Sequence, residues 1–174
     1  MQLDLLDAQM ILRKTPACLD LLLRDLPDEW LHANEGPDTW SPYTVVGHFI
    51  HGERTDWIPR LGIILAQGDT RAFEPFDRFA QLRRDQTIPV ANLLDEFAIL
   101  RDQNLRHLAQ LNLTAEDFSR KGRHPELGAV TLGQLLATWV VHDLTHLNQI
   151  NRVIAKQYTA AVGPWKEYVS ILNR

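Results

Sequence analysis

Apolar residues recur at helical spacing over several long stretches of this sequence. Stretches of twenty or more residues carry apolar side chains at i, i+3, i+4 and i+7, which places those side chains on one face of an α-helix. No segment shows the sustained alternation of apolar and polar residues that is typical of a half-buried strand. The sequence therefore predicts an all-α fold with four long helices, at residues 3–26, 41–67, 89–111 and 131–158.

Two prolines are expected to interrupt these helices. Thr15 and Pro16 match an N-cap followed by proline at the first helical position, so the first helix should break there. Pro59 has no backbone N–H to bond to Thr55 and should bend the second helix at that turn. The last helix should begin with a capping box over residues 131–134, where a hydroxyl and an amide satisfy each other's backbone donors.

The connections between the long helices are expected to hold shorter elements. Residues 27–41 have the composition of a loop, and residues 70–88 form a long connection with a short helical piece near 77–84. A short terminal piece follows Gly163 and Pro164. We predict a four-helix bundle that forms one domain over residues 1–174, with short additional helices in the connections and at the C-terminus. Cofactor and metal sites in such bundles are built from side chains that face the core.

Composition excludes several classes of protein. The 174 residues carry a formal net charge of −4, which lacks the basic excess that nucleic-acid binding requires. The longest uncharged apolar stretch, residues 127–141, is too short to span a membrane, and no secretory signal precedes the first helix. We therefore expect a cytoplasmic protein without nucleic-acid or membrane partners. The single cysteine, Cys18, falls among leucines and is expected to pack in the core.

A pair of histidines in the last helix is the strongest indication of chemistry. His142 and His146 are spaced i, i+4, which places both imidazoles on one helical face within reach of one metal ion. That face also carries Leu135, Trp139 and Val153, so it should point into the core. Buried imidazoles need hydrogen-bond acceptors or a metal, and the flanking residues offer few acceptors. The metal is the preferred interpretation, and a hydrogen-bonded core pair is the alternative.

A third ligand should come from another helix. His48 is the preferred candidate, because its helical face carries small residues and the bend at Pro59, which leave room for an ion and a ligand. His51 lies farther around the helix and is expected at the rim or as a hydrogen-bond donor to the ligands. The other histidines, His32, His107 and His124, fall in loops or on polar faces and are interpreted as structural or solvated.

Three imidazoles without a thiolate leave a coordination position for water or substrate, as in a catalytic site. Zinc, nickel, iron and copper all accept such a donor set.

Two acidic residues stand close to these histidines in sequence. Asp143 follows His142 where zinc proteases of the H-E-x-x-H type carry a glutamate base, but the aspartate and the lack of surrounding strands argue against a protease. Asp143 is expected to orient a neighbouring group or to form an ion pair, and it is the one candidate for base catalysis. Glu53 is expected to pair with Arg54, Arg60 or an arginine of a partner helix.

The sequence resembles the DinB-like (YfiT-like) superfamily of metal-dependent four-helix-bundle proteins. The resemblance rests on residues 40–60, on residues 124–149 with the H-x-x-x-H pair, and on residues 161–165, and it covers nearly the whole chain. It implies that His48, His142 and His146 bind a divalent metal such as zinc or nickel at one end of the bundle. It also implies that a low-molecular-weight thiol could bind the metal and attack an electrophile, and that the protein forms a homodimer.

Two classes of function follow from these observations. The preferred hypothesis is a metal-dependent enzyme acting on a small-molecule substrate, a transferase that activates a low-molecular-weight thiol at the open metal position. Aromatic residues expected to wall its pocket are Trp40, Phe73, Phe76 and Trp139. The alternatives are a metal-dependent hydrolase that shares the same histidines, and a non-enzymatic helical module that binds a ligand or serves in stress responses.

Overall fold

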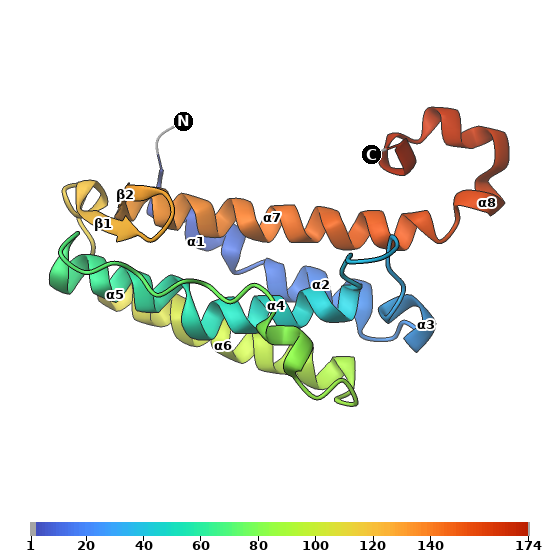
Figure 1. Cartoon of the computed structure of the whole chain (residues 1–174), viewed down its shortest axis with the longest axis horizontal. Coiled ribbons are helices and arrows are strands. Elements are labelled where there is room, and N and C mark those ends of the chain that lie inside the picture. The colour runs from blue at the N-terminus through green and yellow to red at the C-terminus, as the bar shows by residue number, and fades with distance from the viewer. Residues whose placement is uncertain (1–2, 174) are drawn as a thin grey trace.

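The computed structural model describes residues 3–173 and is mostly helical. Four long arms lie roughly side by side in Figure 1 and form a four-helix bundle. Two arms are each divided into two helices, α1 (Leu5–Leu12) with α2 (Thr15–Leu23) and α4 (Pro42–Thr55) with α5 (Trp57–Gln67). The other two are the continuous helices α6 (Val90–Gln110) and α7 (Leu132–Lys156). The predicted all-α bundle class is confirmed.

The first arm breaks where the sequence predicts. The Asp4 carboxylate caps α1 by accepting from the backbone N–H groups of Leu6 and Asp7, at 2.8 and 3.1 Å. Pro16 lies in the first turn of α2, where a missing backbone N–H costs no helical hydrogen bond. Lys14, rather than Thr15, occupies the N-cap position.

The second arm breaks within the turn from Thr55 to Pro59, where the bend was predicted. Asp56 leaves the helical path with φ −110° and ψ −71°, and α5 starts at Trp57. This break places Pro59 in the first turn of α5. Backbone N–H groups in the first turn have no acceptor within the helix, so the missing N–H of proline costs no hydrogen bond there. Dividing the arm at Asp56 therefore removes the need to bend a continuous helix around the proline.

A β-hairpin lies in the connection between α6 and α7, where the sequence pattern does not indicate strands. The strands β1 (Lys121–His124) and β2 (Gly128–Thr131) pair antiparallel, and Thr131 then caps α7 in the predicted capping box with Gln134. Each strand has four residues, which is too short to produce a recognisable alternating pattern. Glycine is required at position 122, because a Cβ there would lie 2.6 Å from Ile64 Cγ1.

The core lies between the four arms in two clusters. One joins α2, α4 and α6 and includes Leu19, Phe49 and Phe97. The other joins α1, α5 and α7 at the hairpin end and includes Trp57 and Trp139.

Cys18 does not join the core as expected, because it is exposed. The buried positions of α2 are Thr15, Leu19 and Leu23, spaced four residues apart, and Cys18 lies outside that row.

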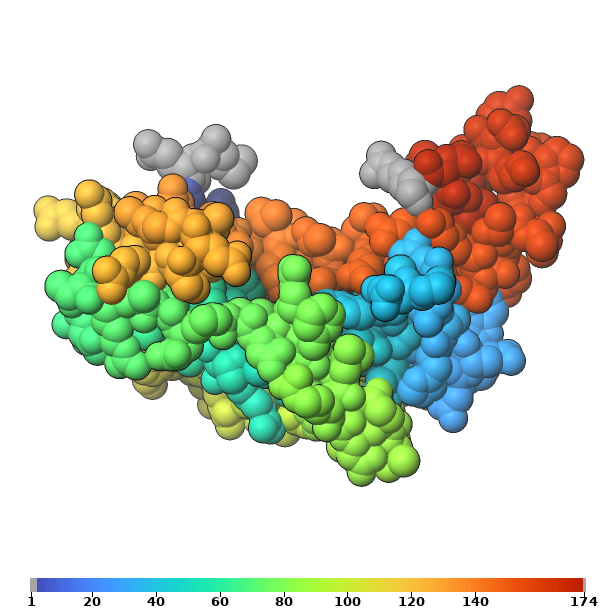
Figure 2. Space-filling model, viewed as in Figure 1, coloured from blue at the N-terminus to red at the C-terminus, as the bar shows by residue number. Residues whose placement is uncertain are grey.

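Short elements fill the connections and the C-terminus. They are α3 (Asp28–Leu31), η1 (Ala80–Arg83), η2 (Asp117–Ser119), α8 (Thr159–Val162), η3 (Gly163–Tyr168) and η4 (Ser170–Asn173). Elements α8 to η4 form a C-terminal arm that projects beyond the bundle and turns back above the end of α7 (Figures 1 and 2). Within residues 3–173, no helix has both the length and the apolar character that crossing a bilayer requires.

Candidate metal centre

Helices α4 and α7 bring three imidazole rings together. His48 Nε2 lies 3.0 Å from His142 Nε2, and the ring centroids of His142 and His146 are 4.4 Å apart. The ring centroids of His48 and His146 are separated by 4.7 Å. One nitrogen from each ring falls within 4.8 Å of the other two. Two nitrogens that bind one cation at about 2.1 Å stand about 3.4 Å apart in tetrahedral geometry, so small ring shifts suffice for shared coordination.

Burial holds two of the rings, those of His48 and His146, in the neutral form that metal binding requires. His48 is only 4% exposed, and burial lowers its pKa to about 3, with further lowering from the neighbouring His146 and His142. Burial also lowers the pKa of His146 to about 4. At neutral pH these two imidazoles therefore carry lone pairs instead of positive charges.

The hydrogen-bond partners of the rings also fit a metal. His146 Nδ1 lies 2.7 Å from Gln149 Oε1, which places the proton on Nδ1 and leaves Nε2 free to bind a cation. The Nδ1 atoms of His48 and His142 are buried and have no hydrogen-bond partner within residues 3–173. The Nε2 atoms of His48 and His142 face each other, and a donor set of three imidazoles suits a divalent transition metal.

The three rings line a cavity of about 850 Å³, large enough for a small molecule. Trp40 packs against His48 with ring centroids 4.8 Å apart and stacks on His146 at 6.1 Å. Phe76 approaches His48 edge-on at 5.5 Å. Trp40 and Phe76, together with Phe73, line the cavity as predicted.

Trp139 does not line this cavity, which corrects the prediction for that residue. It is 1% exposed in the core, where it stacks on Trp57 with ring centroids 5.6 Å apart. Its indole Nε1 donates to Glu53 Oε1 at 3.2 Å. Trp57 forms part of the cavity wall instead and lies 5.1 Å from the His142 ring.

Two ion pairs belong to the cavity wall and were not predicted as site features. Asp56 Oδ1 lies 2.6 Å from Arg60 Nε, and both side chains are almost buried. Burial raises the pKa of Asp56 despite the positive charge of Arg60. At another part of the wall, Glu35 receives two hydrogen bonds from Arg152, at 2.8 and 2.7 Å.

A buried ionic network underlies the histidines. Arg101 of α6 donates to Glu53 Oε1 of α4 at 2.8 Å and to Asp143 Oδ2 of α7 at 2.6 Å. It also donates to the backbone carbonyl of Leu12 at 2.8 Å, and Thr15 donates to Asp143 at 2.6 Å. The network joins all four arms, and its side chains are almost fully inaccessible to water.

Asp143 therefore lies in the core and is not among the residues that line the cavity. Its Oδ1 is 3.9 Å from His142 Nδ1, just beyond hydrogen-bond distance. Base catalysis by Asp143 remains a prediction that no observation tests. The predicted pairing of Glu53 with an arginine of a partner helix is realised by Arg101.

The remaining histidines occupy different environments. His51 stands outside the three-ring cluster, with its ring 4.9 Å from Phe76 and its Nε2 3.4 Å from the Thr55 hydroxyl. His124 lines the cavity from β1, which the sequence did not indicate because the hairpin was not predicted. His32 and His107 are exposed.

The geometry defines a class of protein: a helical bundle with three imidazoles facing a cavity large enough for a small molecule. The sequence model of the DinB superfamily matches residues 11–150, and the chain belongs to this superfamily. A similar solved structure is YfiT from Bacillus subtilis, described as a probable metal-dependent hydrolase with an unusual four-helix bundle topology. The match has a TM-score of 0.75 and 22% identity over 87% of this chain and 86% of that one, which shows a shared fold. No curated protein matches the chain.

Proposed function

We propose that His48, His142 and His146 bind a divalent transition metal and that the protein is a metal-dependent enzyme for a small-molecule substrate. The observation that carries this proposal is the convergence of three imidazoles, one nitrogen of each lying within 4.8 Å of the other two. Zinc and nickel suit the donor set best, and iron is also compatible. Such a metal, when bound, supplies Lewis acidity to water or to the thiol of a cofactor.

The residues of the chain prepare the site for this chemistry. Gln149 fixes the orientation and proton position of His146, and the buried ring of His48 is held between Trp40 and Phe76. The aromatic walls exclude water from one side of the histidines, which strengthens electrostatic interactions there. The Arg101 network fixes α4, α6 and α7 relative to one another and so fixes the distance between the ligands.

Metal content is the direct test of the site. The purified protein should hold about one equivalent of zinc or nickel by elemental analysis, and His48→Ala and His146→Ala should each lose most of it. His107→Ala changes an exposed histidine of α6 and is the matched control. Undiminished metal in both ligand variants would rule out the three-histidine centre.

Thermal unfolding provides a second test. Metal at 100 times its dissociation constant stabilises the native state by about 2.7 kcal/mol. For a chain of this size, that stabilisation raises the midpoint by roughly 5–10 °C, and a chelator should reverse the rise. A midpoint that metal and chelator leave unchanged would support the alternative of a non-enzymatic module with a polar core.

The reaction that we propose is group transfer to a low-molecular-weight thiol, with hydrolysis as the second candidate. The cavity has room for a thiol and an electrophile together, which supports transfer. YfiT is described as a probable metal-dependent hydrolase, and hydrolysis in this chain would use the same His48, His142 and His146. Metal-loaded protein should consume thiol when it is mixed with small thiols and a chromogenic electrophile. Release of the chromophore without loss of thiol would assign hydrolysis instead.

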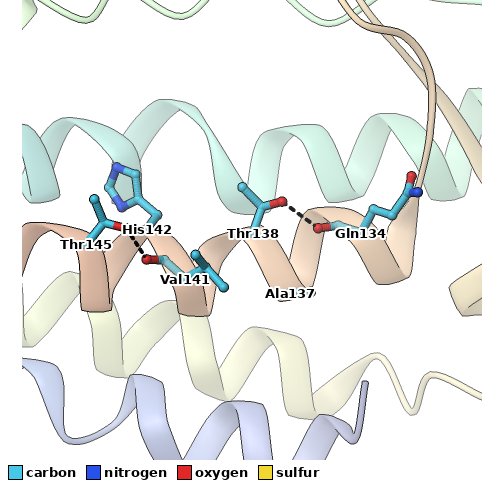
Figure 3. Close-up of a pocket in the computed structure, with 6 residues that line it drawn as sticks. All are labelled: Gln134, Ala137, Thr138, Val141, His142 and Thr145. Atoms are coloured by element: carbon cyan, nitrogen blue, oxygen red, sulfur yellow. Dashed lines mark hydrogen bonds between the residues drawn. The ribbon is translucent and has the colours of Figure 1, made fainter. Parts of the chain in front are cut away.

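We also propose that the protein forms a homodimer through the outer face of α7. A shallow groove there is lined by Ala137 and Val141, and Val141 is 61% exposed. The hydroxyl groups of Thr138 and Thr145 on this face donate to carbonyl oxygens of their own helix at 2.7 Å (Figure 3). These hydroxyl protons are therefore not available to water, which makes the face less polar. The exposed Trp165 and Tyr168 of the C-terminal arm add apolar surface.

Light scattering after size exclusion should give twice the chain mass for the wild type. Val141→Glu should give the monomer, whereas Ile99→Glu, at an equally exposed position of α6, should leave the dimer intact. A monomeric wild type would rule out this interface.

A single domain over residues 1–174, a cytoplasmic location and the absence of nucleic-acid partners stay predictions. The exposed thiol of Cys18 is compatible with a reducing compartment.

A further inference from the structure

A short segment that precedes η1 runs beside the candidate metal centre. Phe76 in this segment lies 5.5 Å from the His48 ring, and Phe79 lies 6.5 Å from the Trp40 ring. Arg78 stands between these two phenylalanines in sequence and lines the same cavity as the three histidines. The segment therefore brings a guanidinium to the rim of the site.

Arg78 differs from the other arginines that line the cavity. Arg60 is paired with Asp56 at 2.6 Å, and Arg152 is paired with Glu35 at 2.7 Å. Each of these charges is neutralised by an acid of the cavity wall. Arg78 forms no ion pair within the part of the chain that the structure describes. Its side chain is exposed and can therefore turn toward a ligand.

The neighbouring acids do not neutralise Arg78. Asp77 accepts a hydrogen bond from the backbone N–H of Phe79 at 3.1 Å through Oδ1, and its Oδ2 is paired with Arg83. Asp38 and Glu126 also line the cavity, and neither is within ion-pair distance of Arg78 in the described residues.

Hydrogen bonds hold the backbone at Arg78, so the position of its Cα atom beside the cavity is well defined. The buried side chain of Gln81 donates to the carbonyl oxygen of Arg78 at 2.8 Å. The Asp77 cap holds the next peptide, as described above. The positive charge of Arg78 also reaches the metal centre, since it contributes to lowering the pKa of His48 after burial and the other histidines.

We propose that Arg78 binds an anionic oxoacid group of the substrate, a carboxylate or a phosphate, while the reacting part of the substrate lies against His48, His142 and His146. This inference rests on the proposed function and adds the chemical class of the substrate. A guanidinium suits this role because its planar donors match two oxygens of a carboxylate or phosphate at once. The aromatic side chains on either side provide an apolar surface for the rest of the molecule.

Ligand binding to the metal-loaded protein tests the proposal. The probes are benzoate and phenyl phosphate, with benzamide as the neutral counterpart, measured by calorimetry or by NMR titration. Arg78→Gln should weaken binding of at least one of the two anions about tenfold or more and should leave benzamide within twofold. The stronger anion assigns the group as carboxylate or phosphate.

Arg106→Gln is the matched control, because it removes the same charge from an exposed arginine of α6 that pairs with Asp102. Equal anion affinity in Arg78→Gln and wild type would overturn the proposal, as would equal weakening by Arg106→Gln. Both arginines are exposed, so each variant is expected to unfold within about 1 °C of the wild type.

A second series separates this inference from the metal. The same titrations in His146→Ala remove one ligand but leave Arg78 in place. An effect of Arg78→Gln that persists in this background supports the anion site even if metal analysis rejects the three-histidine centre. Anion binding that is lost in His146→Ala but equal in Arg78→Gln and the metal-loaded wild type shows that the anion is bound by the metal alone. This result overturns the role of Arg78, while the proposed metal centre survives.

Discussion

Replacing Arg101 by methionine should destabilise the protein by about 3–5 kcal/mol. The guanidinium is 1% exposed and donates to Glu53, Asp143 and the Leu12 carbonyl. Methionine fills much of the same space without a charge, so it leaves two buried carboxylates without their cation. Removing one partner of a buried ion pair costs about 3–5 kcal/mol, a large part of the 5–15 kcal/mol by which domains are typically stable.

The pH dependence separates this cause from lost packing. Burial alone would raise the pKa of Asp143, but the neighbouring His142, the charge of Arg101 and hydrogen bonds from Arg101 and Thr15 outweigh it and hold the pKa below its ordinary value. In the wild type, the stability from this carboxylate is present above the unfolded pKa and is lost as pH falls. In Arg101→Met the cation is gone and the folded pKa should rise above the unfolded one. The folded state then binds more protons than the unfolded state, so stability increases as pH falls from 7 to 5.

Urea unfolding at pH 7 and pH 5 measures both effects. Arg106→Met is the control, because Arg106 and Asp102 are 75% and 59% exposed and such pairs contribute less than about 1 kcal/mol. A loss below about 1 kcal/mol for Arg101→Met would refute the reasoning, as would a larger loss that is the same at both pH values.

Two further variants test other parts of the fold by urea unfolding. Arg152 lowers the pKa of Glu35 to about 2, so Glu35→Gln should cost up to about 1 kcal/mol at pH 7, and its difference from wild type should shrink as pH falls from 4.5 toward 2. A difference that does not depend on pH would contradict the pairing. Gly122→Ala should cost about 1–3 kcal/mol, because its Cβ would lie 2.6 Å from Ile64. Gly62→Ala, whose Cβ meets nothing within 4 Å in the described residues, should be neutral or stabilising by about 0.5–1 kcal/mol, and equal losses in both would be inconsistent with the close contact.

The helices could be predicted because each carries its own local signals. The apolar stripe of α6 and the capping box of α7 are local patterns, and both helices begin and end within two residues of their predicted bounds. The hairpin was not predicted because the contacts that favour it join residues that are far apart in the sequence. Gly122 is selected by contact with Ile64 and Phe73, which are distant in sequence. Cys18 was assigned to the wrong face because leucine-rich surroundings do not reveal which side of α2 faces inward.

Part of the candidate centre could be predicted from the sequence, because two of its histidines belong to one helix. His142 and His146 are four residues apart on one helix, so their proximity follows from helical geometry alone. The position of His48 beside them depends on how α4 packs against α7, which the family resemblance implied and periodicity does not. Asp56 and Arg60 could not be placed in the cavity wall, because the periodicity of the second arm does not show which of its residues face a cavity.

The burial of Arg101 could have been predicted from its position in the sequence. Arg101 lies four residues after Phe97 and four before Leu105, in the middle of the buried stripe of α6. An arginine at this position points into the core and is not solvated. A charge at such a position requires acids on the facing helices, and the inward-facing acids of the second and fourth arms are Glu53 and Asp143. One cation against two carboxylates leaves a net charge of −1 in the core beneath the histidines. A divalent cation bound at the proposed centre would favour a nearby negative charge, so the network that joins the four arms would also suit the metal that we propose.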